Sequence, residues 1–442
     1  MKSVDRDDLI QALERFLPLQ RWFGGKGHEL VEINPEVIDL VREEWPALIR
    51  VEAVVKASGI DDERYNVLIG LRPADWTLTF LEGNSEALLG ELNTDEGPVW
   101  AYEAVRDTEL SRRLFKELFP DILQPARVRP ITAEMSNTML IYDDQVVFKI
   151  FRTLSEKVNL DLEVTEALGR VGFPHVAAPL GVWRKDGTDL GMVQPYLAGG
   201  VEGWAMALTS LRDMFGSRAD PWVSGGDFAA EAFRLGTTTG KLHAALAEAF
   251  GTFPGNSAEW AKAMEGQLER IDHPDLDKEA ASRMFERLAA LEDCGPAIRI
   301  HGDMHLGQVM RTDTGWFVLD FGGEPSRPVE ERRMPTSPMK DVAGMLRSLH
   351  YATWTAAAEQ EDQEQVAQEL AHEWEQRNRG AFVDGYLRAA REAGGLLPTD
   401  EDNFGLVLKA FELDRGIYEI GYELAHRPEW VKIPMAAIQS LY

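Results

Sequence analysis

The sequence contains little of what an exported or membrane-bound protein needs. Its 442 residues include a single cysteine, Cys294, so neither an intrachain disulfide nor a cysteine-based metal site can form. No run of about 18 uncharged apolar residues occurs, and the first residues lack the basic and then apolar segments of an export signal. We therefore expect a cytoplasmic protein that is neither exported nor membrane-spanning.

Basic residues are scarce relative to acidic ones. The chain has 46 Lys and Arg against 74 Asp and Glu, which gives a formal net charge of −28. A surface this acidic repels both phosphodiester backbones and anionic lipids. We therefore expect neither nucleic acid nor a membrane surface as a partner. Most of the acidic excess suits solubility, and part of it would favour a cationic substrate.

The composition is otherwise that of a large globular chain. With 44% hydrophobic residues it can bury an extensive core, and its length predicts two or three subdomains. The apolar spacing predicts an amphipathic helix over residues 5–16, followed by short strands such as 47–55 and 65–71. We assign residues 1–98 to a small first subdomain.

Residues 99–197 have the pattern of a small α+β lobe. A hairpin that turns at the Asp-Asp pair 143–144 is followed by a predicted helix over 159–170. A second hairpin turns at the Asp-Gly pair 186–187. Strands, one helix and then strands indicate a small lobe of mixed structure.

The remaining residues, 198–442, are predicted to be mostly helical. The segment 194–200 carries one Pro and two Gly, which suits a hinge between two lobes. The overall expectation is an α+β fold of two lobes, preceded by the first subdomain. The longest predicted helices span residues 228–248, 277–291, 363–386 and 404–425.

The segment that carries chemistry begins at residue 301 and reads His-Gly-Asp-Met-His-Leu-Gly-Gln, and an apolar strand that ends in Asp320-Phe-Gly follows it. Protein kinases place a catalytic Asp five residues before a metal-binding Asn, and a later strand presents a metal-binding Asp-Phe-Gly. Here Asp303 precedes Gln308 by five residues, and Gln supplies the same amide oxygen as Asn. We predict Asp303 as general base, and Gln308 and Asp320 as ligands of Mg²⁺.

The same logic requires a nucleotide-binding part upstream. Lys149 lies within a predicted apolar strand, where an ammonium must be paired, and Glu163 or Glu166 on the following helix can pair with it. We predict that Lys149 holds the phosphates of ATP. The polar residues Ser136, Asn137 and Thr138 could cover those phosphates, and the hinge residues Gln194 and Tyr196 are expected to border the nucleotide.

Other interpretations of these motifs are weaker. A metallophosphoesterase also uses Gly-Asp-x-His, but it needs a second cluster of ligands, which the sequence lacks. Residues 236–241 imitate a phosphate-binding loop with the wrong spacing, so a helix interior is expected there. His301 and His305 have the spacing of a zinc helix without its Glu. We expect them to fix the loop, with His305 the nearer to the reacting groups.

These motifs identify a family resemblance. The chain resembles actinobacterial maltokinases and the related glucosamine kinases, which belong with aminoglycoside phosphotransferases among kinase-like enzymes. The resemblance implies a protein-kinase-like fold with an N-terminal cap, use of ATP and Mg²⁺, and Asp341 bracing the catalytic loop. We also expect a monomer. The motifs that carry it are Arg21 to Lys26, Ser136 to Thr138, Glu202 to Met206, His301 to Gln308, Ser337-Pro338, Asp341 to Gly344, and Phe411 through Tyr418-Glu419 to Trp430.

Two departures from the maltokinase pattern concern the acceptor. Those enzymes have Asp-Phe-Glu-Gly, whereas this chain has Gly322 in place of the Glu. They also have Lys at the position of Arg415, and the two cations present hydrogen bonds differently. Acidic residues that include Glu412, Asp414 and Glu419 fall on one predicted helix, and carboxylates suit a substrate ammonium. We therefore favour glucosamine, phosphorylated to glucosamine 6-phosphate, with Glu412 as the leading residue for the amine. The alternative is maltose, converted to maltose 1-phosphate; an aminoglycoside is less favoured.

Overall fold

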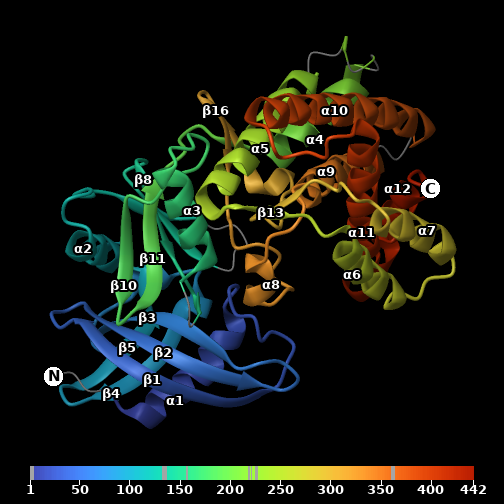
Figure 1. Cartoon of the computed structure of the whole chain (residues 1–442). Coiled ribbons are helices and arrows are strands. Elements are labelled where there is room, and N and C mark those ends of the chain that lie inside the picture. The colour runs from blue at the N-terminus through green and yellow to red at the C-terminus, as the bar shows by residue number, and fades with distance from the viewer. Residues whose placement is uncertain are drawn as a thin grey trace. The chain divides into compact units, whose positions relative to one another are not determined.

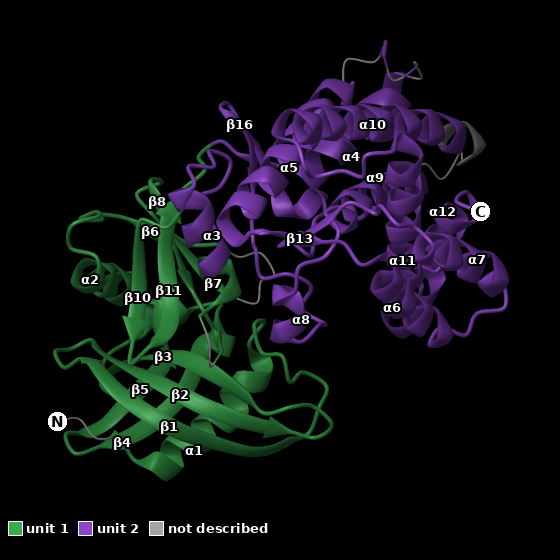
Figure 2. Cartoon of the chain, viewed as in Figure 1, with its two compact units in different colours: residues 1–162, 178–198 green, residues 163–177, 199–442 purple. Residues whose placement is uncertain are grey.

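The computed structural model describes residues 4–131, 137–155, 158–217, 220, 222–223, 227–359 and 364–442. The chain divides into two compact units, coloured separately in Figure 2. Unit 1 comprises Met1–Leu162 and Ala178–Ala198, and unit 2 comprises Glu163–Ala177 and Gly199–Tyr442. Sheets dominate unit 1 and helices dominate unit 2 (Figure 1), which confirms the α+β expectation.

Unit 1 begins with helix α1 (Arg6–Phe16) against an antiparallel sheet. Asp5 caps the helix by accepting hydrogen bonds from the next N–H groups, and the apolar face with Leu9 and Leu13 enters the core beneath the sheet. The strand order is β1-β2-β3-β5-β4, with β9 paired to β3. The strands are β1 (Leu30–Arg42), β2 (Ala47–Ala57), β3 (Glu63–Pro73), β4 (Leu88–Thr94), β5 (Gly97–Glu103) and β9 (Thr153–Leu154).

A second antiparallel sheet in unit 1 carries the predicted nucleotide lysine. Its order is β10-β11-β8-β7-β6, and helix α2 (Thr108–Leu118) covers one face, where Phe115 packs on Tyr142. Both turn residues Asp143 and Asp144 have positive φ, as a tight hairpin requires. The predicted hairpins are therefore confirmed. The strands are β6 (Val128–Pro130), β7 (Thr138–Tyr142), β8 (Val146–Ile150), β10 (Gly181–Lys185) and β11 (Thr188–Pro195).

Helix α3 (Leu160–Arg170) follows β9 and confirms the predicted helix. Its first residues belong to unit 1, and the rest belong to unit 2. Unit 2 then consists mainly of helices: α4 (Gly203–Ser217), α5 (Ala229–Phe250), α6 (Ser257–Glu269), α7 (Lys278–Ala289), α8 (Val329–Arg333), α9 (Met339–Ala358), α10 (Glu364–Ala393), α11 (Glu401–His426) and α12 (Lys432–Gln439). Within the described ranges, no helix is both long and apolar enough to cross a membrane.

Helices α5 and α10 pack backbone to backbone through glycines. A Cβ built on Gly236 would lie 1.9 Å from the carbonyl oxygen of Phe382, and one on Gly385 would lie 2.1 Å from that of Phe233. Side chains at these positions would therefore push the helices apart. The glycine-rich segment 236–241 is thus a helix interior, as predicted, and serves helix packing.

Short strands in unit 2 present the predicted catalytic segments. β15 (Val309–Thr312) pairs with β16 (Gly315–Val318) in a hairpin, and β12 (Val201–Glu202) extends it. β13 (Thr252–Pro254) pairs with β14 (Pro296–Ile298), which leads into the loop that begins at His301. Because these strands lie on either side of the loop, both ends of the catalytic segment are fixed to regular structure.

Candidate active site

The catalytic loop is held by the buried carboxylate of Asp341 at the start of α9. One oxygen accepts the N–H of His301 and the other that of Gly302, each at 2.8 Å, and Nε2 of His243 lies 3.1 Å away. Burial alone would raise the pKa of Asp341, but the hydrogen bonds and charge of its partners outweigh this and lower the pKa. The structure thus confirms that Asp341 braces the loop.

His301 connects the loop to the strand before Asp320. Its Nε2 donates to the carbonyl of Leu319 at 2.8 Å, while Nδ1 accepts the N–H of Asp303 at 3.3 Å. A ring that donates through one nitrogen and accepts through the other is held in one orientation. His301 therefore ties the backbone of Asp303 to the residue that precedes Asp320.

The Asp303 side chain is half-buried and faces two cationic or imidazole groups. Its Oδ1 lies 3.5 Å from a guanidinium nitrogen of Arg415, and its Oδ2 lies 3.8 Å from Nε2 of His305. Nδ1 of His305 accepts the N–H of Gly307. Burial lowers the pKa of His305 despite the Asp303 charge, so the ring is neutral near pH 7 and acts on Asp303 only weakly.

The β15–β16 hairpin brings Gln308 and Asp320 to the same end. The carbonyl of Gln308 accepts the N–H of Leu319 at 2.9 Å, and Val309 pairs with Val318. Asp320 itself has a φ of 55°, a left-handed conformation that costs a non-glycine residue about 1 kcal/mol or more. Such strain is typical of side chains that are held for function.

Gln308 and Asp320 together offer one amide oxygen and one carboxylate. Among the described residues, no cluster of three or more His, Cys, Asp or Glu could hold a metal ion alone. Mg²⁺ commonly takes only one or two protein oxygens and completes its shell with substrate phosphates and water. The donor set therefore fits a magnesium ion that arrives with a nucleotide.

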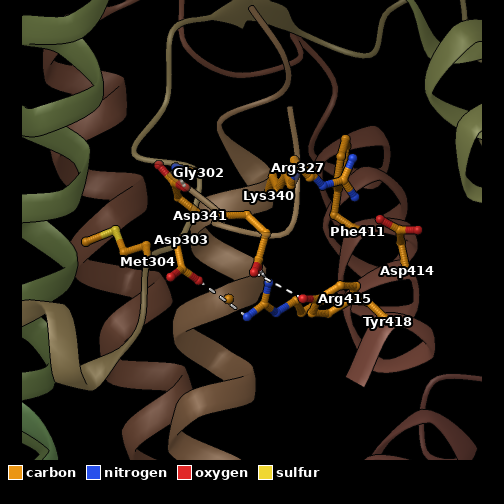
Figure 3. Close-up of a pocket in the computed structure, with 12 residues that line it drawn as sticks. Gly302, Asp303, Met304, Arg327, Lys340, Asp341, Phe411, Asp414, Arg415 and Tyr418 are labelled. Carbon is orange, nitrogen blue, oxygen red and sulfur yellow. Dashed lines mark hydrogen bonds and ion pairs between the residues drawn. The ribbon is translucent and has the colours of Figure 1, made fainter. Parts of the chain in front are cut away.

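A pocket within unit 2 lies beside Asp303. Figure 3 shows Asp303 and Asp414 on different sides of it, from the catalytic loop and from α11. Arg415 extends across the pocket to Glu324, with 2.7 Å between them, and Tyr418 donates to the same carboxylate. Burial would raise the pKa of Glu324, but Arg415 outweighs this and lowers the pKa. The pocket lining also includes Gly302, Met304, Arg327, Lys340, Asp341, Gly344 and Phe411.

Asp414 is the carboxylate of this pocket that has no ion-pair partner among the described residues. Its one side-chain hydrogen bond comes from Nε2 of Gln267, at 2.8 Å. Burial raises the pKa of Asp414 even though Lys340 opposes the shift, and burial lowers the pKa of Lys340. Both groups would gain from a ligand that supplied hydrogen bonds or opposite charge.

The prediction for Glu412 is wrong. Both of its carboxylate oxygens accept from Arg379, at 2.7 and 2.9 Å, and the residue is 4% exposed. Glu412 does not line the pocket. A bidentate ion pair of this kind neutralises the carboxylate, so Glu412 stabilises the packing of α10 and α11 and is already matched by a cation.

Glu419 supports the pocket indirectly. It contacts Arg347 at 2.8 Å and lies 3.6 Å from Nε of Arg415, although it is outside the pocket lining. Glu423, further along α11, binds Arg427 and Tyr351. Glu412, Glu419 and Glu423 of α11 are therefore neutralised by arginines of the same unit, whereas Asp414 has no ion pair among the described residues.

The nucleotide residues predicted in unit 1 are partly rearranged. Nζ of Lys149 lies 2.7 Å from Oδ2 of Asp161, and both residues are buried. Glu163, which itself belongs to unit 2, lies 3.2 Å from Arg333 of the same unit, and Glu166 is exposed. The predicted pairing of Lys149 with one of these glutamates is therefore wrong, because Asp161 on the first turn of α3 occupies that place.

The remaining predicted nucleotide residues lie in unit 1 as well. Thr138 accepts a hydrogen bond from Arg152, and Ser136 falls outside the described residues. Gln194 lies on β11, and the ring of Tyr196 receives the guanidinium of Arg129 at 5.6 Å. These positions stay predictions with respect to ATP.

Sequence reasoning missed Asp161, Glu324 and Tyr418. A signal existed for Glu324, which follows Asp320 by four residues in the motif that carries this predicted metal ligand. Tyr418 was noted only as part of a family motif. Asp161 carries no local signal, because it meets Lys149 across 12 residues of the chain.

Comparison with known proteins defines the class. A profile of the phosphotransferase enzyme family matches residues 127–389, which include Lys149, Asp303 and Asp320. The chain therefore belongs to this family, and it is a phosphotransferase with a protein-kinase-like fold. A profile of the maltokinase N-terminal cap domain matches residues 16–107.

More particular likeness is to glucosamine kinases. The chain is 28% identical over 333 residues to a glucosamine kinase of Mycolicibacterium smegmatis, covering 71% of this chain and 79% of the relative. It is also 28% identical to one from Streptacidiphilus jiangxiensis, covering 62% and 64%. A solved glucosamine kinase with glucosamine, ADP and inorganic phosphate has the same fold, at a TM-score of 0.68, 20% identity and 99% coverage of both chains.

Proposed function

We propose that this protein is an ATP- and Mg²⁺-dependent kinase that transfers the γ-phosphate of ATP to glucosamine, giving glucosamine 6-phosphate. The observation that carries the acceptor assignment is the pocket beside Asp303, which contains a carboxylate, Asp414, without an ion-pair partner in the described part of the chain. An ammonium ion is the natural complement of such a group. The names of the similar proteins point to the same acceptor.

The geometry supports a direct transfer. Asp303 accepts the proton of the acceptor hydroxyl. The hydroxyl oxygen bonds to the γ-phosphorus while the bond between that phosphorus and ADP breaks. His301 and Asp341 fix the backbone of this residue, so its carboxylate is positioned before substrate arrives. Mg²⁺, held by Asp320 and Gln308, would neutralise charge on the phosphates.

The roles of the other residues follow from their charges. Lys149, buried in a sheet and paired with Asp161, is suited to hold phosphate oxygens of ATP. A guanidinium nitrogen of Arg415 lies 3.5 Å from Asp303, so its positive charge attracts that carboxylate. Asp414, in place of Glu412, binds the acceptor amine. The sugar hydroxyls are left for Lys340 and Arg327, which line the same pocket.

Maltose is the second candidate, and the observation that favours it is the match of residues 16–107 to a maltokinase cap domain. The cap lies outside the acceptor pocket, whose lining residues are all in unit 2. A match in the cap therefore bears on the acceptor less directly than Asp414 does.

An ADP-release assay with one acceptor at a time separates these possibilities. We would compare glucosamine, glucose, maltose, N-acetylglucosamine and aminoglycosides, and confirm the product by phosphorus NMR. Asp303→Asn is the control: it should lower turnover by about 10²–10⁴-fold with an unchanged melting temperature. A clear preference for maltose would replace the glucosamine assignment, and near-normal turnover by Asp303→Asn would remove the proposed base.

A further inference from the structure

One motif of the cap has no place in the mechanism so far. Residues 21–26, which read Arg-Trp-Phe-Gly-Gly-Lys, follow α1 and contribute Trp22 and Phe23 to the core of the first sheet. The ring of Phe23 packs on Tyr65 at 5.2 Å. The ring of Trp22 also packs on Tyr65, at 5.8 Å, and in addition faces the guanidinium of Arg152 at 4.8 Å from the ring centre. A cation over an indole face is a favourable, directional contact.

Arg152 is fully buried, three residues after Lys149, and is held from several sides. A guanidinium nitrogen donates to Glu103 at 2.7 Å, and another donates to the backbone carbonyl of Asn66 at 3.3 Å. The backbone carbonyl of Arg152 accepts the N–H of Asn66 at 2.7 Å. The cap strands β3 and β5 thus fix both the side chain and the backbone of this residue.

Two further N–H groups of Arg152 donate to the predicted phosphate-covering segment. Nε–H donates to the hydroxyl oxygen of Thr138 at 2.8 Å, and the backbone N–H donates to Oδ1 of Asn137 at 3.4 Å. In both residues an acceptor oxygen is occupied by Arg152. Their hydrogen-bond donors, the Thr138 hydroxyl proton and the Asn137 amide hydrogens, are thereby turned to other directions, and donors are what phosphate oxygens require.

We propose that Arg152 is a positioning residue of the nucleotide site, through which Trp22 and Glu103 of the cap orient Thr138 and Asn137 toward the phosphates of ATP. The inference rests on the proposed use of ATP. It assigns the cap a part in nucleotide affinity, because a cation that is buried and paired on all sides cannot change rotamer without losing several interactions at once.

A double-mutant cycle across Arg152 tests this link. Trp22 and Thr138 both contact Arg152, and no contact between the two is recorded among the described residues. We expect Trp22→Leu to raise the Kd for ADP about five-fold and Thr138→Val about ten-fold. In the double variant the Kd for ADP should rise about ten-fold in total, which is less than the product of the two single effects. The reason is that either substitution alone already interrupts the contacts that run through Arg152. Kd is measured by calorimetry with Mg-ADP.

Phe23→Leu is the matched control, because it truncates a neighbouring aromatic residue of the same core that lacks the Arg152 contact. It should lower the melting temperature as Trp22→Leu does, with an unchanged Kd for ADP. If Trp22→Leu does not fold, Trp22→Phe and Arg152→Lys replace it, with smaller shifts of the same kind. Multiplicative effects in the cycle, or an unchanged Kd in the folded Trp22 variant, would overturn the proposal. A wild type that binds no ADP would overturn the use of ATP itself.

Discussion

Glu412 and Asp414 lie two positions apart in α11 and have different hydrogen-bond partners. Glu412 receives two hydrogen bonds from Arg379, whereas Asp414 receives one from Gln267 and borders the pocket. Arg415, the next residue, crosses to Glu324 and Asp303. Under the proposed function, recognition of an amine depends on which carboxylate lacks a cation, and not on the number of carboxylates in the helix.

Asp414→Asn should lower kcat/KM for glucosamine and leave glucose nearly unaffected. Loss of a charge-assisted hydrogen bond of about 1.5–3 kcal/mol corresponds to about ten- to a hundred-fold. The measurement is the glucosamine-to-glucose ratio of kcat/KM. Glu412→Gln is the control: it breaks a buried ion pair, so it should lower the free energy of unfolding by about 3–5 kcal/mol without changing that ratio. The reverse pattern would restore the original assignment of Glu412.

The preference for glucosamine should also depend on pH in a defined direction. Burial raises the pKa of Asp414 above its usual value of about 3.9, so its charge is lost at a higher pH than that of an ordinary aspartate. The glucosamine-to-glucose ratio of the wild type should therefore fall on acidification, and it should fall again where the amine loses its proton. In Asp414→Asn the acidic fall should be absent; its persistence there would assign the titration to another group.

At the scale of elements, a single carboxylate joins α5, α9 and the catalytic loop. Asp341 accepts from His301, Gly302 and His243. Asp341→Asn replaces one acceptor with a donor inside this buried cluster, so we expect it to lower the free energy of unfolding by about 3–5 kcal/mol. Chemical denaturation with urea measures the difference, and a loss below about 1 kcal/mol would contradict the bracing role.

The lowered pKa of Asp341 sets the pH range of this contribution. A folded-state pKa below the unfolded value of about 3.9 means that the stabilisation is complete above that pH and is lost as the pH falls through the folded pKa. The difference in unfolding free energy between wild type and Asp341→Asn should thus stay constant through neutral pH and shrink below about pH 4. A difference that changed between pH values near neutrality would point to another group.

The close contact of α5 with α10 gives a second prediction for elements. Gly236→Ala would place a methyl group against the backbone of α10, and such overpacking typically costs about 1–3 kcal/mol. Gly380→Ala is the matched control within α10, because a Cβ there meets nothing within 4 Å. It should raise stability by about 0.4–1 kcal/mol. Equal thermal shifts for both variants would exclude close helix packing as the reason for the glycine at 236.

At the scale of the whole molecule, the residues divide between two units by chemistry. Lys149 and the segment around Thr138 belong to unit 1, whereas Asp303, Asp414 and the pocket belong to unit 2. Nucleotide and acceptor functions should therefore respond separately to mutation. Because of this division, a mutational defect can be assigned to one unit by measuring the affinities for nucleotide and for acceptor separately.

Lys149→Ala should raise KM for ATP and lower kcat, while the Kd for glucosamine measured without nucleotide stays unchanged. The substitution also leaves Asp161 buried beside the vacated position, which costs stability. The double variant Lys149→Ala/Asp161→Ala should recover stability without recovering ATP use. Calorimetry and thermal unfolding provide both readouts. Collapse of glucosamine affinity in either variant would contradict the division of functions between the units.

The sequence by itself determined the features that depend on local order. The spacing of Asp303, Gln308 and Asp320 identified the reaction class, and apolar periodicity with turn residues located the hairpins and the longest helices. These features could be predicted because each depends on residues close together in the chain. The same is true of the helix interior at 236–241, whose spacing rules out a phosphate loop.

Only the tertiary structure decided which charges are paired. Glu412 meets Arg379 across 33 residues and Asp414 meets Gln267 across 147, whereas Lys149 takes Asp161 in preference to either predicted glutamate. On a helix face all of these carboxylates look alike in sequence. Whether a carboxylate is available to a substrate depends on whether the fold places a cation from a distant part of the chain beside it. Burial makes this pairing decisive, because an unpaired charge in the interior is costly.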